Sequence, residues 1–226
     1  MMVILPIKSG PHWIPVAPSG YAVELQGAEL AVGYRLKNLS NIMEPIIVAH
    51  AMGRADQATT RLSIKAALTA NGKLPYFEID GVRQELDSEW LDVVIKTNTD
   101  IVCGYRSFVQ GLDPEMLEAY PARELVKARN GEEPYDWKVR WAESGGQLHN
   151  DRMIALKNDP VWLNISDLGH PHPPFAFGSG MDVVDVSRVE AVELQLIGWR
   201  SDIEVAPCPI CDSEAESGNG EAGSDN

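Results

Sequence analysis

The hydrophobic pattern of this chain changes after Gly131, and this change limits the possible folds more than any other feature. Before Gly131, apolar residues recur at helical spacings through several long stretches. After it, the segments are short, separated by turns, and contain several tryptophans and prolines. Long amphipathic helices followed by strand-sized pieces are typical of an α+β fold. No internal repeat is visible, so a repeat architecture is not expected.

This pattern divides the chain into four parts. Residues 1–20 hold four prolines and two short apolar runs, which predict an extended N-terminal arm or edge strand. Residues 21–130 are predicted to be mainly helical, so the fold class is α+β with a helical N-terminal two-thirds. Residues 131–200 are predicted to form a small mixed strand and helix region. Residues 201–226 are predicted to be a disordered acidic tail, because they have too few apolar side chains to offset the entropy of ordering.

Local signals predict several helix boundaries. Helical spacing extends over residues 24–42 and, more strongly, from Pro45 to Asn71. Asp87 is a candidate N-cap for a long helix that ends at Gly111. Asp113 and Pro114 are predicted to begin another helix, with Pro114 at its first position.

Further signals are read from the turns. An extended piece with a turn at Asp80-Gly81 follows Asn71. Pro121 is predicted to restart a helix that closes at Asn130-Gly131. The segments RMIALK and PVWLNI are each strand-sized, and Ser187-Arg188-Val189-Glu190 is a capping box that predicts a helix from Arg188 to Leu196.

Composition excludes some classes of function. The net charge is −14, and residues 201–226 carry seven acidic side chains with no Lys or Arg. A general nucleic-acid binder would instead show a basic footprint. No window approaches 18 consecutive apolar residues, and no basic region precedes the first apolar run, so neither a membrane span nor a secretory signal is expected. Three cysteines fit a reducing cytosol better than a disulfide-built secreted fold.

The sharpest metal signal is Cys208-Pro209-Ile210-Cys211, because two thiolates at this spacing can share one zinc ion. A closed structural site needs four ligands, and the remaining candidates are Cys103, His149, His170 and His172. None of these forms a second local pair, so two reduced surface cysteines beside the tail are the favoured interpretation and zinc is the alternative.

The stretch from His170 to Gly180 contains two histidines, three prolines and two glycines. The two imidazoles could share one face and hold a metal or act as a base, but histidines on a proline-stiffened surface loop are the favoured interpretation. Gly178-Ser179-Gly180 matches neither a nucleophile elbow nor a phosphate loop, and predicts a tight turn. Phe175 and Phe177, two residues apart, are expected to press one face of an extended strand onto a core.

A modest basic patch is expected in the mixed region. Lys138, Arg140, Arg152 and Lys157 could contact phosphate or pair with the acidic side chains of the chain itself. In an acidic protein, internal pairing is favoured.

The order of motifs between Asp87 and Ile197 resembles the C-terminal half of phage minor head proteins of the Mu F-like head morphogenesis family. The resemblance is carried by WKVRW, GGQLHNDRMIALKNDPVW, HPPFAFGSGM and DVVDVSRVEAVELQLI, with TNTDIVCGYRSF upstream. His149 matches the family's histidine, Asp159-Pro160 with Trp162 match its aspartate-proline-tryptophan turn, and Pro173-Pro174 match its proline pair. Ser179-Gly180-Met181 departs from the family's Cys-Arg-Cys strand.

The resemblance implies a non-catalytic component of the virion or procapsid that assists head assembly near the portal, made in the cytoplasm of a bacterial host. It implies portal and capsid proteins as partners, an oligomeric assembly, no cofactor, and neither a membrane nor a sequence-specific nucleic acid as a partner. The residues expected to shape and lock the module are Trp137, Trp141, His149, Asp159, Pro160, Trp162, Pro173, Pro174, Phe175, Phe177 and Gly180.

Two alternatives of other classes stay open. One is a small hydrolase or nuclease that uses His149, His170 or His172 with Arg140 or Arg152, and it predicts at least two of these imidazoles beside a carboxylate in one cleft. The other is a zinc-stabilised adaptor built on Cys208 and Cys211.

Overall fold

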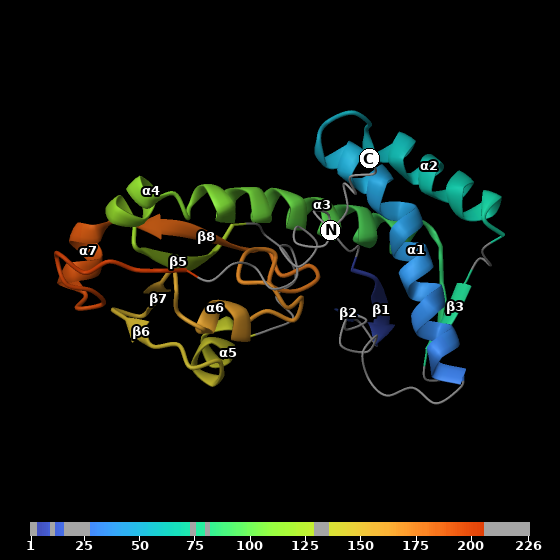
Figure 1. Ribbon diagram of the computed structural model, residues 1–226. Helices are drawn as coiled ribbons and strands as arrows, with labels where there is room; N and C mark the ends of the chain where they lie inside the picture. The colour runs from blue at the N-terminus through green and yellow to red at the C-terminus, as the bar shows by residue number, and fades with distance from the viewer. Residues whose placement is uncertain are drawn as a thin grey trace, which may run out of the picture.

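One long helix, α3 (Ser88–Gln110), runs above the sheet and connects a helical part to a sheet-containing part (Figure 1). The computed structural model describes residues 4–9, 12–15, 28–72, 76–79, 82–128 and 136–205. The other elements are β1 (Pro6–Ser9), β2 (His12–Pro15), α1 (Ala28–Ala51), α2 (Gln57–Ala70), β3 (Tyr76–Ile79), β4 (Val82–Glu85), α4 (Pro114–Ala119), β5 (Ala122–Lys127), α5 (Trp137–Glu143), β6 (Leu148–His149), β7 (Arg152–Leu156), α6 (Val161–Asn164), β8 (Met181–Val186) and α7 (Arg188–Glu193). The predicted α+β class is confirmed.

The helical part forms around a core shared by α1, α2 and the first half of α3. Its fully buried side chains include Met43 and Ile47 from α1, Ile64 from α2, and Trp90 and Val94 from α3. Asp87 caps α3 as predicted, since its carboxylate accepts a hydrogen bond from the backbone N–H of Trp90 at 2.8 Å.

The predicted single helical stretch from Pro45 to Asn71 is wrong in its boundaries. Pro45 lies inside α1 instead of starting a helix, because burial of its neighbours outweighs the backbone hydrogen bond that proline cannot make. The break comes later, at Gly53, whose φ of 72° ends the helix in the left-handed region. Asp56 then caps α2, accepting from Thr59 N at 2.7 Å.

Residues 4–9 and 12–15, the described part of the predicted N-terminal arm, are extended, and this segment is attached to α3. β1 and β2 pair as an antiparallel hairpin. Ile4, just before β1, donates its backbone N–H to the buried Asn98 side chain at 2.7 Å, and the Asn98 amide donates back to the Ile4 carbonyl at 2.9 Å. This reciprocal pair satisfies backbone groups that burial would otherwise leave without partners.

A four-stranded antiparallel sheet organises the second part, in the order β6-β7-β5-β8. Its strand β5 corrects our prediction of a helix between Pro121 and Asn130. The residues ARELVK favour a helix by propensity, but pairing with β7 on one side and β8 on the other prevails. A central strand of the sheet therefore comes from the region before residue 130, which we predicted to be mainly helical.

The two faces of the sheet are covered by different elements. On one face, α7 and the residues after it pack over Ala122, Ile154 and Val186. On the other, α5, α6 and the segment from Ile165 to Gly180 pack against Leu125, Ala155 and Met181. Ser187 caps α7 as predicted, accepting from Glu190 N at 3.3 Å, although the helix ends at Glu193 because Gln195 has a positive φ.

The segment PVWLNI, which we expected as a possible strand, contains the short helix α6. Asp159 starts it by accepting a hydrogen bond from Val161 N at 2.8 Å, with Pro160 at the cap position. RMIALK forms the strand β7. Within the described residues, no helix combines the length and apolar character needed to span a membrane.

Candidate functional site

His170 and His172 are fully buried, so our expectation of surface histidines is wrong. Their rings stack with centroids 4.2 Å apart and an interplanar angle of 10°. His170 Nδ1 lies 2.8 Å from the carbonyl of His172, and His172 Nδ1 lies 3.0 Å from that of Pro173. A carbonyl only accepts, so each Nδ1 must donate. The rings are therefore used to fix the loop that carries them.

The electrostatic consequence is clearest for His170. Burial, with a smaller contribution from the neighbouring His172 ring, lowers the pKa of His170 to about 3. The imidazole is therefore neutral at pH 7, and among the described residues its Nε2 has no hydrogen-bond partner.

The loop after these histidines lies directly against α3. A Cβ added at Gly104 would stand 1.9 Å from the carbonyl oxygen of Pro173, so only glycine allows this approach. The bond between Pro173 and Pro174 is cis, and Gly178 and Gly180 both have positive φ, as the predicted tight turn requires. Gly104 lies in the TNTDIVCGYRSF helix that contributed to the family resemblance.

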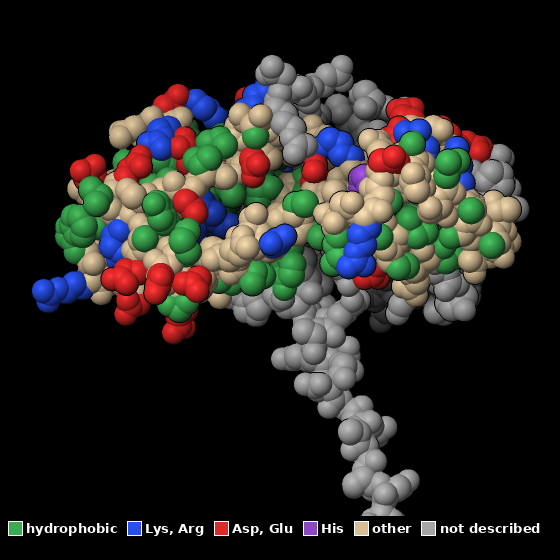
Figure 2. Space-filling view, turned by 90° about the horizontal axis from the view of Figure 1, so that it is seen from above, with side chains coloured by type: hydrophobic (Ala, Val, Ile, Leu, Met, Phe, Trp, Pro, Cys, Tyr) green, Lys and Arg blue, Asp and Glu red, His purple; other side chains and the backbone are tan. Residues whose placement is uncertain are grey.

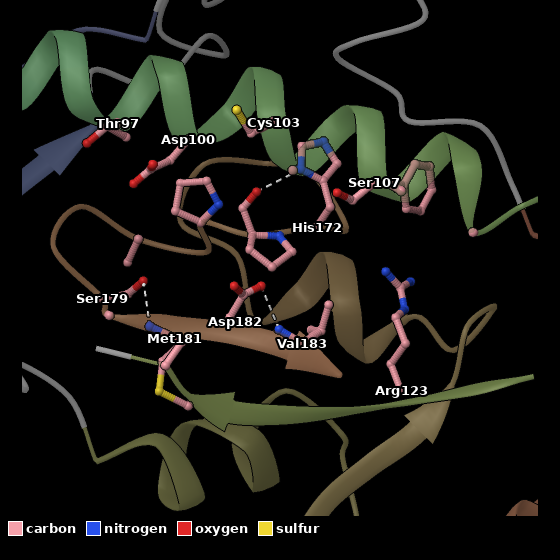
Figure 3. A pocket seen from close by; sticks show the side chains of 18 of the residues that line it. Thr97, Asp100, Cys103, Ser107, Arg123, His172, Ser179, Met181, Asp182 and Val183 are labelled. Atoms are coloured by element: carbon pink, nitrogen blue, oxygen red, sulfur yellow. Dashed lines mark hydrogen bonds between the residues drawn. The ribbon is translucent and has the colours of Figure 1, made fainter. Parts of the chain in front are cut away.

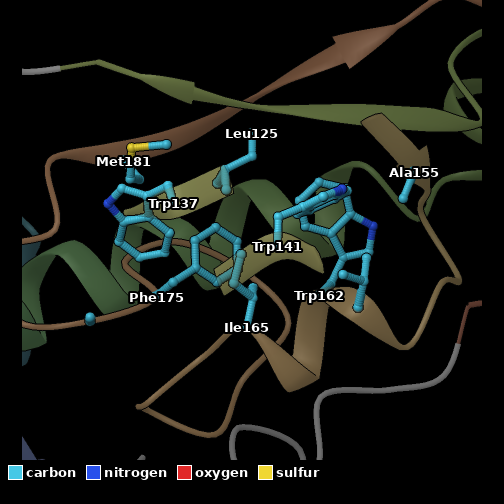
Figure 4. Close-up of a cluster of buried hydrophobic side chains, with 10 residues drawn as sticks. Leu125, Trp137, Trp141, Ala155, Trp162, Ile165, Phe175 and Met181 are labelled. Atoms are coloured by element: carbon cyan, nitrogen blue, oxygen red, sulfur yellow. The ribbon is translucent and has the colours of Figure 1, made fainter. Parts of the chain in front are cut away.

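Four aromatic residues of the mixed region, Trp137, Trp141, Trp162 and Phe175, form the centre of a hydrophobic cluster under the sheet (Figure 4). Trp141 meets Trp162 edge to face at 5.2 Å between centroids, and Trp162 stacks on Phe175 at 6.2 Å. The indole N–H of Trp141 donates to the Gln147 carbonyl and that of Trp162 to the Leu156 carbonyl. The rings of Trp141 and Trp162 are thus both packed and hydrogen-bonded.

Phe175 and Phe177 do not share one core, contrary to our prediction. Phe175 belongs to the tryptophan cluster, whereas Phe177 packs with Ile4, Ile101 and Leu168. The backbone between them is not a strand, so the alternation expected of extended residues does not apply.

A cavity of about 530 Å³ lies between α3, the sheet and the histidine loop (Figure 3). Its walls include Thr97, Asp100, Cys103, Ser107 and Phe108 from α3, Arg123, Lys157, Met181, Asp182 and Asp185 from the sheet region, and His172, Pro173, Pro174, Ser179 and Gly180 from the loop. Three residues that we assigned to packing alone, Pro173, Pro174 and Gly180, therefore also border a cavity.

Two buried cations distinguish this cavity. The side chain of Lys157 is 2% exposed and its Nζ lies 2.9 Å from Asp185 Oδ1. Arg123 is 5% exposed, and its guanidinium stands 5.1 Å from the Trp162 ring centroid and 5.5 Å from that of Phe108. Burial lowers the pKa of Arg123 to about 10 and also lowers the pKa of Lys157, yet the guanidinium stays charged at neutral pH.

The predicted basic patch is internally paired, as favoured from the sequence. Each of its four cations has an acidic partner within 3 Å. The pairs are Lys138–Asp151, Arg140–Asp167, Arg152–Glu124, Arg152–Glu190 and Lys157–Asp185. On the face shown in Figure 2, acidic and basic side chains are interspersed with hydrophobic ones.

Of the three histidines named for a hydrolase, His170 and His172 stack on each other, whereas His149 lies apart from them. His149 is a half-buried residue of β6 and does not line the cavity that His172 borders. Arg140 and Arg152, the arginines named together with these histidines, are held by carboxylates elsewhere.

No group of three or more His, Cys, Asp or Glu side chains in the described part of the chain could hold a metal ion. Cys103 is free and exposed. Cys208 and Cys211 lie outside the described residues, so the zinc alternative stays a prediction.

Sequence reasoning missed Arg123 and Gly104. Arg123 was hidden by the expected helix, because its burial depends on a strand that pairs across the sheet. Gly104 looked like an ordinary glycine inside a helix. Glycine destabilises a helix interior unless close packing requires it, so its presence there was the one available sign of a close contact.

No protein-family profile, curated protein or solved structure matches this chain.

Proposed function

We propose that this protein is a structural component of a phage or prophage head, a minor head protein that acts in capsid assembly near the portal and catalyses no reaction. It would reside in the virion or procapsid, after synthesis in the cytoplasm of the bacterial host. Its partners would be portal and capsid proteins in an oligomeric assembly.

The proposal is supported by what the motifs of the resemblance do in the fold. Trp141, Trp162 and Phe175 are fully buried and touch one another. The Asp159-Pro160 turn starts α6, and the proline pair packs on Gly104 of α3. Residues far apart in the sequence are thus used to lock one module, which is the role the family resemblance implies for them.

A hydrolase or nuclease is the less supported function. Both Arg140 and Arg152 are engaged in ion pairs, and the two stacked histidines donate their Nδ1 hydrogens to backbone carbonyls. A general base needs a ring nitrogen free to take a proton from substrate, with the other nitrogen oriented by a fixed acceptor. His170 and His172 both meet the second condition, but both side chains are fully buried.

The proposal is tested by co-expressing the tagged chain with the portal and major capsid proteins encoded beside it. We expect the chain to co-sediment with portal oligomers or with procapsids. A Trp162→Ala variant, in which the aromatic cluster is broken, should lose this association, whereas Cys103→Ala, at an exposed site, should keep it. A wild-type chain that stays monomeric and off the particles would contradict the proposal.

A further inference from the structure

The guanidinium of Arg123 is a buried charge that makes no ion pair with an acid among the described residues, although the negative charge of Asp185 nearby offsets part of the effect of burial on its pKa. Arg123 rises from β5 into the space below α3, on one side of the cavity (Figure 3). Only 5% of the residue is exposed, and its Nε has no hydrogen-bond partner among the described residues. The hydrogen bond found for its Nη2 is a long one, 3.4 Å to the carbonyl of Lys157. A buried charge without a partner is costly, so such a group is normally paired.

The nearby carboxylates do not provide that partner. Asp185 is engaged by Lys157 at 2.9 Å, and Asp100 by Lys96 at 2.8 Å. Asp182 accepts from the backbone N–H of Val183 at 2.8 Å, and no ion pair joins any described acid to Arg123. The aromatic rings of Phe108 and Trp162 offer a cation a favourable face but no counter-charge.

We propose that this cavity is a binding site for a carboxylate, which pairs with the Arg123 guanidinium. A guanidinium presents two parallel N–H donors that match the two oxygens of a carboxylate. The volume of about 530 Å³ falls within the range of small-ligand sites, and Phe108, Met181 and Pro174 offer apolar wall for the body that carries the carboxylate.

The charged side chains of the cavity walls favour a ligand that carries a single negative charge. Lys96, Arg123 and Lys157 are balanced in number by Asp100, Asp182 and Asp185. Lys96 is paired with Asp100 and Lys157 with Asp185, so Arg123 is the wall cation that has no ion pair among the described residues, and one anionic group is enough to pair it. A phosphate dianion would bring a second negative charge close to the three aspartates, and like charges in a poorly solvated site repel strongly.

The test is a titration of the full chain with sodium benzoate, in which sodium chloride is exchanged for benzoate at constant ionic strength. The midpoint temperature of thermal unfolding should rise by about 2–4 °C at a benzoate concentration roughly fivefold above its dissociation constant. The Arg123 Nε–H resonance should shift in the ¹H–¹⁵N spectrum along the same binding curve. Benzyl alcohol, which has the ring without the charge, should produce neither effect.

Three variants make the result specific. Arg123→Met should fold, because an apolar side chain replaces an unpaired buried charge, and should weaken benzoate binding by about tenfold or more. Arg123→Lys keeps the positive charge but loses the two parallel N–H donors of the guanidinium, so it should bind benzoate with intermediate affinity. Arg106→Met removes one positive charge from an exposed position of α3 and should leave binding unchanged.

A second experiment distinguishes a carboxylate on a polypeptide from one on a small organic acid. In it, a capped peptide with one Glu next to a Phe replaces benzoate. Tighter binding of the peptide identifies a polypeptide side chain, and tighter binding of benzoate a small organic acid. The proposal would be overturned if each probe bound Arg123→Met as tightly as it binds wild type. It would also be overturned if wild type showed no response to either probe at concentrations up to about 50 mM. Inorganic phosphate that stabilises wild type as strongly as benzoate does would overturn the choice of a carboxylate.

Discussion

At the scale of single residues, the unusual feature is that polar side chains in the interior carry out structural tasks. Asn98 ties the N-terminal segment to α3, and the stacked His170 and His172 tie their own loop together. Each of these three side chains makes at least one hydrogen bond with the backbone, which makes its burial tolerable. These residues look like candidates for chemistry in the sequence, and only their burial reveals the structural role.

His170 makes stability dependent on pH. Its pKa is about 3 in the folded protein and near 6.5 in the unfolded chain, so the unfolded state binds a proton first as pH falls. The stabilisation is complete above pH 6.5 and is lost as pH falls toward 3. Between pH 7.5 and pH 5, this residue alone should lower the free energy of unfolding by roughly 2 kcal/mol.

Urea unfolding at the two pH values, for wild type and His170→Gln, measures this contribution. Glutamine keeps a hydrogen-bond donor but does not titrate, so the variant should lose about 2 kcal/mol less than wild type over the same interval. An equal loss in both proteins would show that His170 is not the group responsible.

At the scale of elements, the contact between α3 and the proline loop depends on one missing side chain. A Cβ at position 104 would overlap the Pro173 carbonyl, so Gly104→Ala must push the loop away from α3. We expect a destabilisation of about 1–3 kcal/mol, even though alanine is the better helix former by about 1 kcal/mol. Denaturant unfolding would measure it, with Cys103→Ala at the neighbouring exposed position as the control. A Gly104→Ala protein as stable as wild type would contradict the close packing.

Arg152 joins three elements, since it reaches Glu124 on β5 and Glu190 on α7 from its own strand β7. These hydrogen bonds, that to Glu124 above all, raise its pKa above the ordinary range. Arg152→Met should cost about 1 kcal/mol, because the side chain is 39% exposed and water screens the pairs. Its cost should fall in high salt, and Arg61→Met, which removes the surface pair with Asp92, should cost less. No difference between the two variants would argue against the three-element link.

The elements also show where sequence reasoning stops. Asp87, Asp113 and Ser187 were identifiable as caps because capping is a contact within three residues. The strand β5 was not, because its state is set by Val186 and Leu156, which lie far along the chain. The cavity beside Arg123 could not be predicted for the same reason, because its walls come from α3, the sheet and the histidine loop, which are far apart in the sequence.

At the scale of the whole molecule, α3 unites two cores. Its first half is buried against α1 and α2, and its second half borders the cavity and the histidine loop. The module that carries the family resemblance is thus attached through a single long helix to a helical part. We propose that this arrangement presents the module to portal and capsid partners.

The most direct measurement is the protein content of phage heads purified from the organism that carries this gene, with the gene intact and with it deleted. Quantitative mass spectrometry should find the chain in intact particles at a fixed ratio to the portal protein, and deletion should reduce the yield of DNA-filled heads. Particles that lack the chain, together with an unchanged yield of filled heads after deletion, would contradict the claim.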